Sequence, residues 1–190
     1  MPINLGTKPQ HGFDQPLGLL SDCHRRIENF LGMMIRVLER SQHGNKPLEP
    51  QEREALEAAI QYFDVAGPRH TQDEEESLFP RLRASNDPNA HAALARMQSL
   101  EEDHRHADTM HAEVKQLCRR WLETGPLPVA DSHRLGQLLG ELQHIYTRHL
   151  SLEDNELFPL AARVLNHQQL EEVGQEMARR RGLSMPGPQR

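Results

Sequence analysis

Apolar residues recur at steps of three and four through most of the chain, which is the spacing of one face of an α-helix. Turn-forming sequences rich in Gly, Pro, Asn and Asp interrupt this pattern. We therefore expect four long helices, near residues 16–41, 50–84, 90–123 and 130–165. A shorter helical pattern follows at about 167–180. No stretch alternates like a β-strand, so the sequence predicts an all-α protein.

Short connections between long helices favour antiparallel neighbours. The sequence therefore predicts an up-down-up-down four-helix bundle with a short additional C-terminal helix. We divide the chain into an extended N-terminal lead-in at 1–15, the bundle at 16–165, and a short C-terminal helix and tail at 166–190. With 190 residues, the chain is long enough to bury a substantial core in one domain.

Each of the four long helices carries polar residues within its own apolar stripe. A buried imidazole or carboxylate is costly without a partner, so these positions need one. From the first helix to the fourth, the stripes are Leu20, His24, Ile27, Leu31, Met34 and Leu38; Leu56, Ile60, Phe63, Gly67, His70, Glu74 and Leu78; Met97, Leu100, His104, Asp108, His111, Val114, Cys118 and Trp121; and Leu135, Leu138, Leu142, Ile145, His149, Glu153, Leu157 and Leu160.

A histidine followed four residues later by a glutamate, and five residues after that by Phe-Pro, occurs twice. Residues four apart share a helix face, so each copy aims one imidazole and one carboxylate at the same point. Single histidines occupy inward positions on the other two helices. At about 1.5 Å per residue, all of these groups fall in one layer of the bundle. The sequence therefore predicts a site for a pair of metal ions, with the ligands His24, His70, Glu74, His104, His149 and Glu153.

The residue types restrict the choice of metal. Imidazole and carboxylate together suit iron, and they also suit manganese or zinc. Cys23 and Cys118 have no metal-motif spacing, so a zinc–thiolate site or an iron–sulfur cluster is not expected. Four imidazoles and two carboxylates divided over two metals leave room for a small ligand.

The two His-x-x-x-Glu pairs, each followed by Leu-Phe-Pro, and the two single histidines resemble the hemerythrin-like (HHE cation-binding) domain family. The similarity covers about residues 16–165, and the ending Met177–Gly182 is also similar to bacterial members. The resemblance implies a four-helix bundle around a non-haem di-iron centre. By this resemblance, the four histidines are terminal ligands, and Glu74 and Glu153 bridge two Fe ions that share an oxo or hydroxo group.

Oxygen-carrying members of that family have a fifth histidine at the position of Asp108. The sequence is therefore nearer to the four-His, two-Glu subgroup, which includes repair proteins of nitrosative stress and an iron- and oxygen-sensing ubiquitin-ligase subunit. Asp108 is open to three interpretations: a ligand, an acceptor for an imidazole N–H, or an exposed residue. His111 is either a buried histidine or a neighbour of the metal site, and Tyr62 and Tyr146 line the site or pack in the core.

The resemblance implies a protein that interacts with O₂, NO or peroxide as a sensor, a scavenger or a stress-response protein. Two alternatives remain: a di-iron enzyme of the peroxidase or oxidase type, and an interaction bundle that the metal stabilises. An enzyme acting on an organic substrate needs positioned acid–base residues beyond the ligands, and none stands out. The sequence does not indicate an oligomeric state.

The net charge of −6 argues against nucleic acid or an anionic membrane as a partner. Arg179, Arg180 and Arg181 form a short basic cluster, which suits a helix C-terminus. No apolar run is long enough to span a membrane, and the N-terminus lacks a signal segment, so we expect a cytoplasmic protein.

Overall fold

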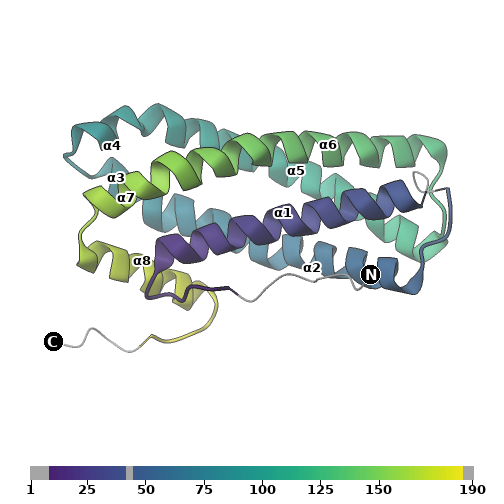
Figure 1. The fold of residues 1–190 in the computed structure, drawn as a ribbon, viewed down its shortest axis with the longest axis horizontal. Helices are drawn as coiled ribbons and strands as arrows, with labels where there is room; N and C mark the ends of the chain where they lie inside the picture. Colours follow the sequence, from purple (N-terminus) through teal and green to yellow (C-terminus); the bar gives the residue numbers. More distant parts are fainter. Residues whose placement is uncertain (1–8, 42–44, 186–190) are drawn as a thin grey trace. The chain divides into compact units, whose positions relative to one another are not determined.

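The computed structural model describes residues 9–41 and 45–185, and every regular element among them is a helix. The fold is an all-α helical bundle with a short additional C-terminal helix, as the sequence predicts (Figure 1). The beginning of the predicted lead-in and the end of the predicted tail, residues 1–8 and 186–190, lie outside the described residues.

The described chain contains four long and four short α-helices, and a π-helical turn follows the second and the fourth of the long ones. The long helices are α1 (Pro16–Arg40), α2 (Pro50–Gln72), α5 (Leu94–Thr124) and α6 (Val129–Leu152). The short helices are α3 (Phe79–Arg83), α4 (Pro88–Ala92), α7 (Phe158–Val164) and α8 (His167–Arg180). The π-helical turns are η1 (Asp73–Leu78) and η2 (Glu153–Leu157).

The second and fourth helices are not single α-helices as predicted, because each contains a π-helical turn. In η1 the N–H of Phe79 donates to the carbonyl of Glu74, and in η2 the N–H of Phe158 donates to that of Glu153. A proline follows each of these phenylalanines. Its missing N–H and its ring disturb the α-helical ladder, and the wider turn ends two residues before it.

Helix ends follow ordinary capping chemistry. The Asn166 side chain accepts from Gln169 N at 2.9 Å, and Gln169 returns a bond to Asn166 N, which starts α8 with a capping box. Asp87 accepts from Asn89 N at 2.7 Å and starts α4, an element that we had expected to be part of the third long helix. Gly125 and Gly182 have positive φ and terminate α5 and α8.

The chain divides into two compact units, and each long helix contributes residues to both. Unit 1 contains Arg26–Gly67 and Asp103–His149. Unit 2 contains the segment that ends at Arg25, together with Pro68–Glu102 and the chain from Leu150 onwards. None of the helices in the described ranges is long and apolar enough to cross a membrane.

Unit 1 has a core of aliphatic residues around one tryptophan. Trp121 is 1% exposed, and the predicted stripe positions between Ile27 and Leu38 and between Leu135 and Ile145 are buried. Asp108 is the exception, because it lies on the exposed side of α5. The prediction that Asp108 lies on the buried stripe of this helix is therefore wrong.

Unit 2 has its own core, to which helix α8 contributes Val173 and Met177. Helix α8 packs on η1, and α3 packs on α4. The other buried members of this core are Leu19, Leu20, Leu78, Phe79, Leu82, Ala93, Met97, Leu100, Leu157, Phe158, Leu160, Ala161 and Leu165.

Residues 9–15 are irregular, but side chains of unit 2 hold them in place. The backbone N–H groups of Gln10 and His11 donate to Asp22 Oδ2 at 2.6 and 2.8 Å. Further along, the backbone of Phe13 crosses α8 at Gly174, where a Cβ atom would lie 1.8 Å from the Phe13 carbonyl oxygen. Only glycine allows this close approach.

Candidate metal centre

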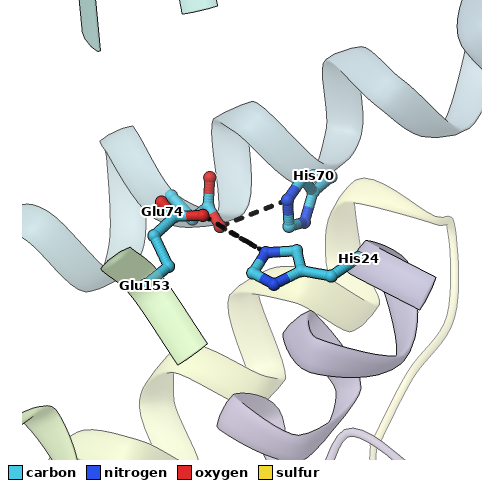
Figure 2. Close-up of side chains that lie close together, drawn as sticks. All are labelled: His24, His70, Glu74 and Glu153. Carbon is cyan, nitrogen blue, oxygen red and sulfur yellow. Dashed lines mark ion pairs between the residues drawn. The ribbon is translucent and has the colours of Figure 1, made fainter. Parts of the chain in front are cut away.

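Four of the six predicted ligands come together in unit 2. His24 is on α1, His70 is on α2, Glu74 is in η1 and Glu153 is in η2. Each offers a ligand atom, and these four atoms all lie within 4.8 Å of one another. Figure 2 shows the two imidazoles and the two carboxylates directed toward a common point.

All four side chains of this group are buried, so any charge on them has lost most of its contact with water. His24 and His70 are 1% and 4% exposed, and both glutamates are 0% exposed. Carboxylates removed from water in this way need positive charge nearby. A bound divalent cation would supply that charge at the point where the donors converge.

The spacing of the donor atoms also fits a cation. Two donors bound to one metal at about 2.1 Å and at right angles lie about 3 Å apart. His70 Nε2 is 3.2 Å from Glu74 Oε1, and His24 Nε2 is 3.2 Å from Glu153 Oε2. The oxygen and nitrogen donors are those that suit iron, manganese and zinc. The residues present therefore fit a metal ion.

Asp154 fixes the orientation of the His24 ring. His24 Nδ1 lies 3.1 Å from Asp154 Oδ1, and the same oxygen accepts from Ser21 Oγ at 2.5 Å. The other nitrogen, Nε2, then faces the two glutamates. Carboxylates behind ligand imidazoles commonly hold them in this way. The His24 ring also stacks on Phe158, with 5.3 Å between the ring centroids.

The charges around His24 shift its pKa. Burial lowers the pKa of its imidazole, but contacts with Asp154, Glu153 and Glu74 raise it more, so that the pKa lies well above 6.5. The carboxyl of Asp154 responds in the opposite sense: burial raises its pKa, and the contacts with His24 and Ser21 lower it further than burial raises it. Three carboxylates thus favour a positive charge at this position, carried by a proton when no metal is bound.

The remaining two predicted ligands lie together in unit 1. The Nε2 atoms of His104 on α5 and His149 on α6 are 3.1 Å apart, and both side chains are buried. Behind His149, its Nδ1 lies 3.4 Å from Asp103 Oδ2, and Arg148 Nη2 donates to the same carboxylate at 2.6 and 2.8 Å. This histidine pair therefore also has a carboxylate behind a ring, with the Nε2 atoms directed at each other.

The structure answers the questions that the sequence left open about neighbouring residues. Asp108 is exposed, which removes its interpretation as a ligand. His111 is half-buried, stacks on Phe63 at 4.3 Å between centroids and contacts the Tyr146 hydroxyl at 2.7 Å. Burial lowers the pKa of His111 to about 4, so it is neutral at pH 7. Tyr62 is buried and stacks on a phenylalanine in the core of unit 1.

Sequence reasoning missed the carboxylates that surround the ligands. Asp103 and Asp154 each directly adjoin a predicted ligand in the sequence, yet they contact a different histidine, one that lies on another helix. Asp73, which precedes Glu74, is 0% exposed and contacts Arg180 and Arg181. Adjacency to a ligand was the only available signal, and it does not name the partner.

The two cysteines behave as ordinary side chains. Cys23 is half-buried, and Cys118 is buried in unit 1. Burial raises the pKa of the Cys118 thiol to about 12, so this group is an inert thiol at neutral pH.

Comparisons with known proteins agree with this geometry. The model of the Hemerythrin HHE cation binding domain matches residues 15–161. A Haemophilus influenzae protein named only as uncharacterized is 24% identical over 173 residues, which cover 89% of this chain and 91% of that protein. The similarity to that relative therefore extends over nearly the whole chain, and the family match spans all six predicted ligands.

Proposed function

Because this chain belongs to the hemerythrin HHE cation-binding domain family, we propose that it is a non-haem di-iron protein. The observation that carries the proposal is the buried group of two imidazoles and two carboxylates in unit 2, whose ligand atoms lie within 4.8 Å of one another. In the proposal, Glu74 and Glu153 each bridge the two metal ions. Zinc or manganese would use the same donors.

His104 and His149 complete the proposed ligand set. Their Nε2 atoms are 3.1 Å apart, about the separation of two donors on one metal ion. Two neutral imidazoles at this distance share at most one proton in a hydrogen bond, whereas a cation accepts lone pairs from both. His104 and His149 would then hold a metal ion together, as would His24 and His70.

The proposed ligand of the centre is O₂, NO or a peroxide, and the proposed role is that of a sensor, scavenger or stress-response protein. Six protein groups divided over two metals leave coordination positions open. Bound iron would supply redox chemistry and affinity for small oxidants. Asp154 and Asp103 would hold the imidazoles of His24 and His149 in place. Burial of the ligand side chains would exclude bulk water. The exposed position of Asp108 supplies no further ligand.

Anaerobic titration with Fe(II), followed by exposure to O₂ or NO, tests this function. We expect saturation near two Fe(II) per chain, and then a near-ultraviolet charge-transfer band after O₂ that does not reverse under vacuum. Glu74→Ala and Glu153→Ala should each lose the dinuclear stoichiometry. His106→Ala is the matched control, because His106 is exposed on the same helix as His104.

Three results would each overturn or replace part of the proposal. Retention of two tightly bound metals in both glutamate variants would reject the bridging role. A band that forms and disappears reversibly with O₂ would instead identify an oxygen carrier. Turnover of peroxide with an added reductant would identify the enzymatic alternative.

A further inference from the structure

The turn that carries Glu74 is attached to helix α8 through its neighbour Asp73. Arg181 donates to both carboxylate oxygens of Asp73, at 3.2 Å from Nη1 and 2.7 Å from Nη2. Arg180 Nη1 donates to Asp73 Oδ1 at 3.0 Å. One carboxylate thus receives two guanidinium groups from the C-terminal end of α8, where Arg180 is the last helical residue and Arg181 is the C-cap.

These contacts extend along η1. Arg180 Nη2 also donates to Ser77 Oγ at 2.8 Å and lies 3.3 Å from Glu76 Oε2. Asp73 is 0% exposed, and the side chains of Arg180 and Arg181 are 17% and 19% exposed. A buried charge that loses its partner is strongly unfavourable, so the geometry of η1 depends on both arginines.

Helix α8 is itself fixed on both sides of this contact. Arg81 of α3 donates to Glu176 Oε1 at 2.9 Å and lies within 3.3 Å of Glu172. On the other side, the backbone of Phe13 packs directly on Gly174. The arginines therefore extend from a fixed helix and can hold η1 in one position.

π-helical turns are rare, and they occur mostly as single turns inside α-helices, frequently at functional sites. The equivalent turn η2 is also held by charged groups: Asp154 contacts Ser21 and His24, and Glu156 lies 3.3 Å from Arg96. In η2 one of these contacts is to a proposed ligand. In η1 the contacts go to α8, which supplies none of the six proposed ligands.

We propose that Arg180 and Arg181 are positioning residues for the metal centre, which hold the Glu74 carboxylate in its binding position by clamping Asp73. The inference rests on the proposed function, because it assigns Glu74 as a ligand. It assigns α8 a role in metal affinity that neither its distance along the chain nor its amphipathic pattern indicates. Groups that hydrogen-bond a metal ligand directly change metal affinity about 10- to 100-fold. The arginines act one residue further away, through the backbone that joins Asp73 to Glu74, so we expect an effect at the lower end of that range.

The test measures Co(II) affinity by competition with a chelator, together with the Co(II) d–d spectrum, in the full chain. Arg181→Met keeps most of the side-chain volume and removes the charge and the donors. Arg179→Met is the matched control, because Arg179 is exposed on the same helix. Met33→Ala, a buried position in unit 1, controls for a general loss of stability.

We expect Arg181→Met to lower Co(II) affinity at least tenfold and to alter the d–d spectrum, with Arg179→Met unchanged. Met33→Ala should lower the apo-protein's unfolding midpoint while its Co(II) affinity remains within about twofold of wild type. Wild-type affinity in Arg181→Met, or an equal loss in Met33→Ala, would overturn the positioning role.

Two further measurements separate the failure of this inference from other outcomes. If Arg181→Met does not fold, Arg181→Lys retains the charge and loses the fork; we expect a severalfold loss, and wild-type affinity would overturn the inference. Glu74→Ala tests the premise. If Glu74→Ala lowers affinity and both Arg181 variants do not, only the clamp is wrong. If Glu74→Ala and both Arg181 variants all bind Co(II) with wild-type affinity, both the clamp and the proposed function are wrong.

Discussion

Asp154 offers a sharp test of how the surroundings of the site tune it. Its carboxylate contacts His24 Nδ1 at 3.1 Å, which leaves Nε2 to face the glutamates. Asp154→Asn keeps the shape and one acceptor oxygen but removes the negative charge. The imidazole then becomes less basic, so its Nε2 should be a weaker ligand.

The size of the effect follows from the exposure of the carboxylate. Contacts of this kind are worth about 10- to 100-fold in metal affinity, which equals roughly 1.4–2.7 kcal/mol. The Asp154 side chain is 33% exposed, so solvent screens part of its charge. We therefore expect about a tenfold loss for Asp154→Asn. Asp154→Ala should lose more, because it also removes the acceptor for the imidazole N–H.

The assay is a competition titration with Fe(II) under anaerobic conditions, supported by the unfolding midpoint of each metal-free variant. Asp108→Asn is the matched control, because it makes the same chemical change at an exposed position. Wild-type affinity in both Asp154 variants would refute the reasoning. An equal loss in Asp108→Asn would refute it as well, since that result would show a general effect of net charge.

Three other predictions follow from named contacts. Burial lowers the pKa of His111 to about 4, from a usual value of about 6.5. Its contribution to stability should therefore be complete above pH 6.5, and the free energy of unfolding should fall by up to about 3 kcal/mol as the pH drops from 6.5 to about 4. Denaturant titrations should find this decline reduced in His111→Gln. Gly174→Ala should lower the free energy of unfolding of the metal-free protein by about 1–3 kcal/mol, because its Cβ would collide with the Phe13 carbonyl. Gly140→Ala, with nothing within 4 Å of the new Cβ, should raise that free energy by about 0.5–1 kcal/mol, and equal thermal midpoints for the two variants would contradict the packing. Three carboxylates raise the pKa of His24 above 6.5. In the metal-free protein, protonated His24 therefore stabilises the fold fully below pH 6.5, and this contribution is lost as the pH rises through the raised pKa. Metal affinity should rise over the same pH range because the competing proton leaves, and a pH-independent affinity would argue against His24 as a ligand.

The spacing of apolar residues predicted the helices well, because burial of one helix face determines that spacing. The first and last helices, α1 and α8, agree with the predicted ranges to within one residue. The π-helical turns were not predicted, since a run of apolar positions four apart is compatible with both kinds of helix. The Phe-Pro sequence was the visible sign of them, but it was interpreted as part of a motif and not as a backbone feature.

The candidate site was more predictable than its surroundings. The repeated His-x-x-x-Glu spacing identified groups that do converge, four in unit 2 and two in unit 1. Asp108 was misplaced because helical spacing alone cannot locate the edge of a buried stripe. The role of Arg180 and Arg181 was missed because basic residues at a helix end already have a sufficient local explanation. Their contact with Asp73 spans more than one hundred residues, and no local pattern specifies it.

The most direct test of a dinuclear metal centre is the metal content of the protein purified from its own host without chelators. We expect close to two metal ions per chain, mostly iron, and a large loss of that content in Glu74→Ala. A ratio near zero in carefully handled wild-type protein, or the same ratio in Glu74→Ala, would contradict this expectation.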